Sequence, residues 1–192
     1  MPKHCQLLLG PKYALLREEF YQVRKSIQIR DDHLCNILVF YGGVDATDET
    51  SKAIRALQTL QDTDVLCDAQ VTVVVGASNE RKDDIAYRCK QVGFRYLCQI
   101  SNMAELMAEA DLMLGAGGST TWERCFLGLP AIVTAIAENQ IQICEDCAKV
   151  GLIFYLGYWD KVHQDDICRT INKMMVSSQM LVMQRKMSQL MG

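Results

Sequence analysis

The stretch Asp111-Leu-Met-Leu-Gly-Ala-Gly-Gly-Ser-Thr-Thr-Trp-Glu123 decides the fold, because a buried strand, a glycine turn and the start of a helix follow one another within it. The apolar run 111–114 is typical of a strand, and residues 119–127 have helical spacing. Glycines between them let backbone N–H groups approach a ligand closely, and a helix start presents further N–H donors. The stretch therefore predicts a turn that suits a pyrophosphate. It is not a P-loop, since no Gly-Lys-Ser/Thr follows.

Short apolar, β-branched runs alternate with helical patterns along the rest of the chain. We expect strands at 35–41, 70–75, 94–99, 111–114, 131–136 and 152–156. We expect helices at 48–60, 80–91, 102–110, 119–127, 139–150, 165–176 and 179–191. This alternation predicts an α/β fold with a doubly wound, parallel, Rossmann-like sheet of about six strands.

Ligands of doubly wound sheets bind beyond the carboxyl ends of the strands, near the point where the strand order reverses. The loops expected at this binding edge are 42–47, 76–79, 99–102, 115–121 and 137–140.

The composition excludes several classes of protein. Apolar residues make up 49% of the 192 positions and charged residues 22%, as in ordinary globular domains. With 20 basic against 23 acidic residues and no basic block, no nucleic acid is expected as a partner. No apolar run reaches the ~20 residues of a membrane-spanning helix, so no integral membrane segment is expected.

Nine cysteines, an odd number in a chain of this length, favour free thiols and a reducing, cytoplasmic compartment over a disulfide scaffold. Cys144 and Cys147 form the one close pair, and neither a second such pair nor neighbouring histidines accompany them. We interpret both as core thiols on one helix. We expect no metal and no cofactor.

Residues 1–30 do not fit the alternating pattern. A run of leucines that ends at Gly10-Pro11 is like the end of a strand, and residues 13–24 have the pattern of a helix, yet neither has a partner of its own. We expect residues 1–30 to be the tail of a missing N-terminal domain or an interdomain segment, with the ligand-binding domain at 31–192. The alternative is an N-terminal helix packed on the sheet.

Several residues at the binding edge have a structural interpretation beside the functional one. Thr120 and Glu123 have the spacing of a helix capping box, while a carboxylate at Glu123 can instead accept both hydroxyls of a ribose. Gly42-Gly43 forms a tight turn or leaves room for a ligand, and Asn139 either caps the next helix or faces a ligand. No histidine lies in these loops, so we assign no catalytic residue and expect any general base outside this chain.

Several longer stretches carry a family resemblance. They are Leu8-Leu-Gly-Pro-Lys-Tyr-Ala-Leu-Leu-Arg17, Phe40-Tyr-Gly-Gly-Val-Asp45, Ile100-Ser-Asn-Met103, Gly115-Ala-Gly-Gly-Ser-Thr-Thr-Trp-Glu-Arg124, Gly128-Leu-Pro130 and Ile136-Ala-Glu-Asn-Gln140. The stretches 100–103, 105–111, 115–123 and 128–130 resemble the nucleotide-binding C-terminal domain of GT-B glycosyltransferases, and the MurG-type N-acetylglucosaminyltransferases in particular. More narrowly, the stretches 8–17, 40–45, 115–124 and 136–140 resemble the UDP-2,4-diacetamido-2,4,6-trideoxy-β-L-altropyranose hydrolase of pseudaminic acid biosynthesis and the related spore-coat polysaccharide proteins.

The resemblance implies which residues bind a UDP-sugar. The backbone of Ile100 would hold the uracil with Met103 packed nearby, and Glu123 would bind the ribose hydroxyls. The residues that would hold the pyrophosphate are Gly117, Gly118, Ser119 and Thr120. The residues that would face the sugar or phosphates, or line the cleft, are Asn139, Gln140, Gly43 and Asp45.

The resemblance also implies a reaction. In the hydrolase family, water cleaves the sugar C1–O bond with inversion and releases UDP and 2,4-diacetamido-2,4,6-trideoxy-L-altrose. The family's catalytic base is a histidine in a glycine-rich loop of an N-terminal domain, so this chain resembles the other half of such an enzyme. The expected partners are a UDP-sugar and that N-terminal domain.

Two alternatives stay open. One is a MurG-like, UDP-sugar-dependent glycosyltransferase, in which an acceptor hydroxyl replaces water. The other is a non-catalytic donor-binding subunit that another chain completes.

Overall fold

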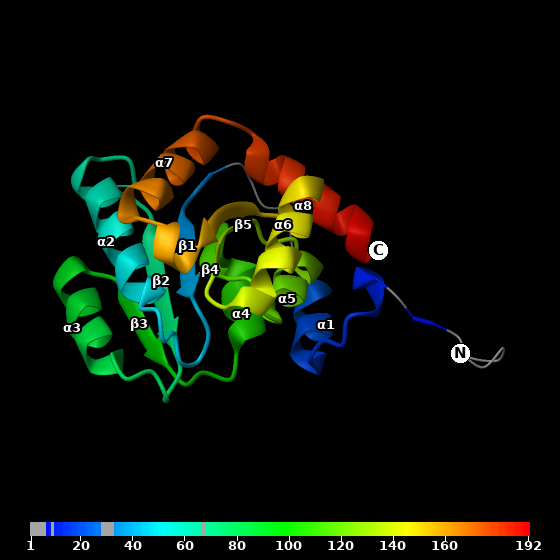
Figure 1. Cartoon of the computed structure of the whole chain (residues 1–192), viewed down its shortest axis with the longest axis horizontal. Coiled ribbons are helices and arrows are strands. Elements are labelled where there is room, and N and C mark those ends of the chain that lie inside the picture. Colours follow the sequence, from blue (N-terminus) through cyan, green and yellow to red (C-terminus); the bar gives the residue numbers. More distant parts are fainter. Residues whose placement is uncertain (1–6, 9, 28–32, 67) are drawn as a thin grey trace.

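A computed structural model describes residues 7–8, 10–27, 33–66 and 68–192 and contains one parallel sheet (Figure 1). Its order is β3-β2-β1-β4-β5-β6. The strands are β1 (Asn36–Phe40), β2 (Gln70–Val75), β3 (Arg95–Cys98), β4 (Leu112–Ala116), β5 (Ala131–Ala135) and β6 (Phe154–Tyr158). The sequence-based prediction of a doubly wound, six-stranded α/β sheet is confirmed.

The central strands are apolar along their whole length because helices cover both faces of the sheet. Every residue of β5 is buried, and so are the first four residues of β4. Strands buried on both faces give continuous apolar runs rather than an alternating pattern, which is why these segments could be found in the sequence. The edge strand β3 has no buried residue.

Two groups of helices enclose the sheet (Figure 1). On one side lie α2 (Glu49–Asp62) and α3 (Lys82–Val92), with α7 (Gln164–Met175) packed against α2. On the other side lie α4 (Met103–Glu109), α5 (Thr120–Phe126) and α6 (Ile141–Val150), with α8 (Gln179–Met191) packed against α5. The strand order reverses between β1 and β4, so the loops that follow these two strands open at one edge of the sheet.

The N-terminal segment packs on the second group of helices. It contains a 3₁₀ turn, η1 (Pro11–Tyr13), and a helix, α1 (Glu18–Arg24), whose Phe20 is fully buried. Arg24 donates a hydrogen bond of 3.0 Å to the backbone carbonyl of Phe126 at the end of α5. The helix expected at 13–24 is therefore present in its second half.

The strand end expected before Pro11 is not confirmed, because Leu7 and Leu8 belong to no strand. Residues 1–6, 9 and 28–30 of the predicted N-terminal segment lie outside the described residues. The division of the chain near residue 30 stays a prediction.

Two other elements differ from the sequence-based expectation. The helix expected at 139–150 consists of a 3₁₀ turn, η2 (Glu138–Gln140), followed by α6. The last strand begins at Phe154 rather than at Leu152. Leu152 and Ile153 are buried without pairing, so their hydrophobicity reflects the core and not the strand.

The core holds the pair of thiols that the sequence suggested. Cys144 and Cys147 on α6 are 1% and 3% exposed, which confirms them as core residues. Helix α8 likewise buries its methionines, which are Met180, Met183, Met187 and Met191. Within the described part of the chain, no helix has the length and apolar character needed to cross a bilayer.

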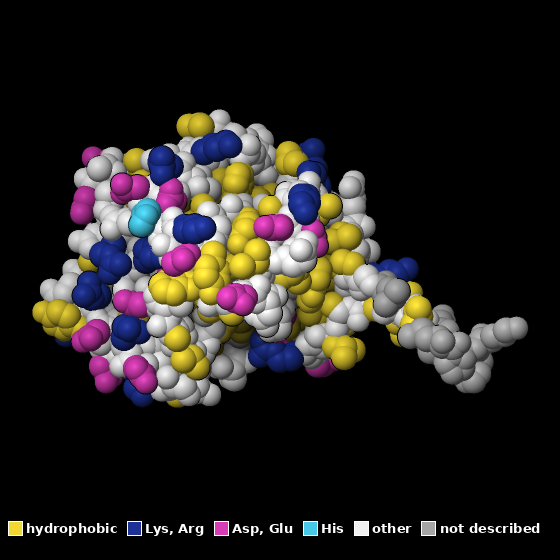
Figure 2. Space-filling view, viewed as in Figure 1, with side chains coloured by type: hydrophobic (Ala, Val, Ile, Leu, Met, Phe, Trp, Pro, Cys, Tyr) yellow, Lys and Arg dark blue, Asp and Glu magenta, His cyan; other side chains and the backbone are white. Residues whose placement is uncertain are grey.

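One face of the molecule is shown in Figure 2, where hydrophobic side chains form a band across the middle. Basic and acidic side chains are interspersed around this band rather than separated into large areas of one sign. This mixture agrees with the small net charge of −3.

The loops after β1 and β2 touch at two glycines, and this contact gives a testable prediction. A Cβ atom added to Gly76 would lie 2.6 Å from the Cα of Gly43, a backbone atom that cannot rotate away. We expect Gly76→Ala to lower the free energy of unfolding by ~1–3 kcal/mol, measured by urea denaturation. The matched control is Gly43→Ala, since a Cβ there meets nothing within 4 Å. Equal losses in the two variants would contradict this account.

Candidate functional site

The glycine turn after β4 lies at the point where the strand order reverses. Phe40, the last residue of β1, is in register with Gly115 of β4. The turn residues Gly117 and Gly118 therefore face the loop that follows β1. Gly118 is half-buried, and among the described residues no acceptor takes its backbone N–H. The N–H of Gly118 is therefore available to a ligand, whereas Gly117 is buried and follows Ala116, which pairs with Thr134 of β5.

The turn packs closely against the start of α6. A Cβ atom at Gly117 would overlap the Sγ of Cys144, so this position accepts only glycine. A Cβ atom at Gly118 would lie 3.8 Å from the side-chain nitrogen of Gln140, whose Oε1 accepts a hydrogen bond of 3.0 Å from the N–H of Ile136. The structure thus brings Gln140 to the glycine turn.

The neighbouring Asn139 lies apart from this contact. It is exposed and lines a groove of about 510 Å³ together with Trp122 and Ile143. Asn139 forms no cap of α6, since the N-cap position belongs to Gln140.

Ser119 and Thr120 follow the turn directly. Ser119 is exposed and Thr120, the first residue of α5, is half-buried. In the described part of the chain, no side-chain hydrogen bond caps the start of α5. Both residues thus follow the glycine turn with side chains that do not cap α5.

Glu123 does not form the capping box that its spacing from Thr120 allows. Its Oε1 instead accepts hydrogen bonds of 3.2 Å from both Nε and Nη2 of Arg17, in the segment before α1. The Glu123 side chain is 17% exposed. The carboxylate is thus free of any role in capping α5, which leaves it able to accept hydroxyl groups.

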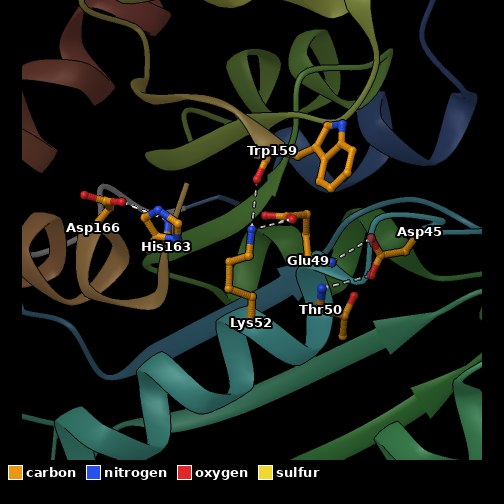
Figure 3. Close-up of polar contacts among 7 residues, drawn as sticks. All are labelled: Asp45, Glu49, Thr50, Lys52, Trp159, His163 and Asp166. Carbon is orange, nitrogen blue, oxygen red and sulfur yellow. Dashed lines mark hydrogen bonds and ion pairs between the residues drawn. The ribbon is translucent and has the colours of Figure 1, made fainter. Parts of the chain in front are cut away.

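Asp45 has a structural task at the same edge (Figure 3). Its two carboxylate oxygens accept the backbone N–H groups of Glu49 and Thr50 at 3.0 and 2.9 Å, at the start of α2. The residue is 4% exposed and has a positive φ of 46°. Asp45 therefore holds the loop after β1 on α2, whereas Gly43 is exposed.

A buried ion pair that the sequence did not reveal lies next to Asp45 (Figure 3). Lys52 Nζ contacts Glu49 Oε1 at 2.7 Å and donates to the carbonyl oxygen of Trp159 at 3.1 Å. Glu49 is fully buried, and its Oε2 has no partner among the described groups. Burial raises the pKa of Glu49, while the hydrogen bond and the charge of Lys52 act in the opposite direction.

Ile100 and Met103 follow β3 at the far side of the edge. Ile100 is half-buried in the loop, and Met103 is the first residue of α4 and 6% exposed. Gln99 adopts a positive φ of 54°, and its Oε1 accepts the N–H of Ala77 at 3.2 Å. The loops after β2 and β3 are thereby joined, with the Ile100 backbone next to them.

Sequence reasoning missed the side chains that support these groups. Arg17 and Arg124 stand in stretches that carried the resemblance, so that resemblance could have suggested them. Glu49 gave no signal, because the burial of a carboxylate depends on tertiary packing.

The chain matches the family described as Glycosyltransferase family 28 C-terminal domain over residues 36–189. MJ1062, an uncharacterized protein of Methanocaldococcus jannaschii, is 34% identical over 146 residues, which are 73% of this chain and 29% of that protein. The spore coat polysaccharide biosynthesis protein SpsG of Bacillus subtilis is 27% identical over 170 residues, which are 88% of this chain and 49% of that protein. The chain thus spans less than half the length of either relative.

The solved structure of MurG from Acinetobacter baumannii has the same fold. It superposes with a TM-score of 0.66 at 17% identity, over 88% of this chain and 48% of that one. Together with the family match, this similarity confirms the expected GT-B C-terminal fold.

The buried Glu49 predicts a pH dependence of stability. Its pKa in the folded protein lies above the ordinary value of 4.5, so its contribution to stability is full below about pH 4.5 and is lost as the pH rises through the folded pKa. Glu49→Gln removes the titration at nearly constant volume. We expect the free energy of unfolding of Glu49→Gln to rise relative to that of the parent protein between about pH 4.5 and neutrality, measured by urea denaturation.

Lys52→Met is a second variant, which removes the partner of Glu49 in the ion pair. Because Lys52 lowers the pKa of Glu49, its removal should make the loss of stability with rising pH steeper than in the parent protein. A difference between Glu49→Gln and the parent that stays constant over this range would refute the assignment.

Proposed function

This chain belongs to the glycosyltransferase family 28 C-terminal domains, and on that premise we propose that it is the UDP-sugar-binding half of an enzyme that uses a UDP-sugar. The observation that carries the proposal is the glycine turn at the reversal of strand order, with the unpaired N–H of Gly118 and with Gln140 beside it. Backbone N–H groups in such turns bind phosphate oxygens at short range. Glu123 follows the turn with a carboxylate able to take the ribose hydroxyls.

Each part of the ligand has its own contacts in this proposal. Gly118 donates its N–H group to the pyrophosphate on a turn that Gly117 shapes, and Ser119 and Thr120 add hydroxyls. The ribose binds at Glu123. The sugar lies toward Gln140 and Gly43, and the uracil lies against the Ile100 backbone and Met103. Asn139 contributes from the rim, and Asp45 contributes indirectly by holding the loop after β1.

For the reaction, we propose a hydrolase that acts on UDP-2,4-diacetamido-2,4,6-trideoxy-β-L-altropyranose. Water attacks C1 on the face opposite UDP, the C1–O bond breaks, and its electron pair leaves with the phosphate oxygen. A base takes the proton of the water, and we place that base in an N-terminal domain of the same enzyme. The support is the resemblance of the quoted motifs to this group and the 27% identity with SpsG. The hydrolase needs no cofactor in this proposal and works in the cytoplasm.

A glycosyltransferase is the second candidate function. The description of the family favours it, because the same donor site serves a reaction in which an acceptor hydroxyl replaces water. A donor-binding subunit without activity of its own would use the same contacts.

The first prediction is selective binding of UDP by this chain. In a calorimetric titration we expect UDP to bind and CDP and NAD to bind more weakly, because the backbone at Ile100 pairs with the uracil edge. A preference for CDP or NAD would refute a UDP site.

The second prediction separates the two roles of Glu123. Glu123→Ala should weaken UDP binding by ~1–3 kcal/mol, the cost of leaving charge-assisted hydrogen bonds unmade. Arg17→Ala is the matched control, since it removes the ion pair and keeps the carboxylate. We expect Arg17→Ala not to weaken UDP binding. If Glu123→Ala leaves the affinity unchanged and only lowers the melting temperature, the carboxylate is structural.

The reaction is tested with the protein encoded by the complete gene. UDP-sugar supplied in water alone should yield UDP and free sugar in equal amounts. Release of UDP that requires an added acceptor would favour the glycosyltransferase.

A further inference from the structure

Arg124 is a cation enclosed beneath the glycine turn. It follows Glu123 on α5, is 0% exposed and ranks among the largest fully buried side chains. Within the described residues, no carboxylate forms an ion pair with it and its Nε has no hydrogen-bond partner. A buried charge without a counter-charge is unfavourable, and burial accordingly lowers the pKa of Arg124. Packing alone therefore does not explain why a charged side chain occupies this buried position.

The residues around Arg124 do not neutralise it. Besides Glu123, which is paired with Arg17, the groups near Arg124 that could carry a negative charge include the thiols of Cys125 and Cys144. Burial raises the pKa of each of these two thiols to about 11. Both thiols are therefore protonated at neutral pH, and the positive charge of Arg124 is not compensated locally.

The hydrogen bonds of Arg124 hold the end of β4 just before the glycine turn and a side chain of α5. Nη1 donates to the carbonyl oxygen of Ala116 at 3.1 Å, and Nη2 donates to Oγ1 of the buried Thr121 at 3.2 Å. All described peptide bonds are trans, and in a trans peptide the carbonyl and the following N–H point in opposite directions. Because the Ala116 carbonyl points to Arg124, the N–H of Gly117 points away from it, toward the side of β4 on which Ala116 pairs with Thr134 of β5.

We propose that Arg124 is a positioning residue for the diphosphate of the nucleotide, which fixes the end of β4 through the Ala116 carbonyl and supplies the buried positive charge that an anion on the turn compensates. This inference rests on the proposed nucleotide site and adds the residue behind it. The guanidinium does not touch the ligand. It acts through its hydrogen bond to the Ala116 carbonyl and through its positive charge. The protein interior screens the field of that charge far less than water does.

A purely structural role would differ in one measurable respect. If Arg124 only pins the shape of the turn, its loss weakens every ligand of the site alike. If its charge supports the diphosphate, its loss weakens ligands in proportion to their phosphates. Uridine, UMP and UDP are the probes that separate these two cases, because they share the nucleoside and differ in charge.

The experiment compares the three affinities in Arg124→Met and Arg124→Lys by calorimetry. In Arg124→Met we expect uridine affinity to stay within about twofold, while UDP affinity falls by about tenfold or more, with UMP between them. Arg124→Lys keeps the cation and should retain most of the preference for UDP over uridine. Arg88→Met, which removes an exposed arginine on α3, should leave all three affinities unchanged.

The outcomes distinguish this inference from the proposed function. An equal loss for uridine and UDP in Arg124→Met, or no loss for UDP, overturns the role of Arg124 and leaves the nucleotide site intact. Absence of UDP binding by the unaltered chain overturns both. If Arg124→Met does not fold, inorganic pyrophosphate replaces the nucleotides, and it should raise the melting temperature of the parent protein and of Arg124→Lys. No rise in either protein overturns the inference.

Discussion

The parallel pairing of β1 with β4 is the constraint on which the rest of the structure depends. These strands are distant in the sequence, yet Phe40 and Gly115 lie in register at the centre of the sheet. The pairing brings the loop after β1 and the glycine turn after β4 to one edge. The helices diverge to opposite faces from this point, so the edge stays open between them. Every group assigned to the ligand lies in loops or helix starts at that edge.

The sequence predicted the sheet well because its central strands are buried on both faces. In β1, β4 and β5 the hydrophobic run and the strand nearly coincide, since no solvent-facing positions interrupt them. The prediction was wrong at Leu152, where burial occurs without strand pairing, and at Asn139, where a 3₁₀ turn precedes the helix. Local hydrophobicity indicates that a residue is buried, but it does not indicate which backbone hydrogen bonds that residue forms.

The candidate site could be predicted only in part, for a related reason. The glycine turn is a local feature and was visible in the sequence. The engagement of Asp45 with the start of α2 and the ion pair of Glu123 with Arg17 depend on contacts between distant segments. The buried charges of Glu49 and Arg124 are likewise results of packing, because the same residue types are usually exposed.

Because Gly117 packs directly against Cys144, substitutions in the turn and on α6 affect each other. The space that a side chain at 117 would need is already filled by the thiol of Cys144. A change at either position therefore alters what the other can accept, and the effects of the two changes are not additive. Any increase in volume on α6 at this point displaces the backbone of the turn, so the shape of the turn depends on a helix that need never touch the ligand.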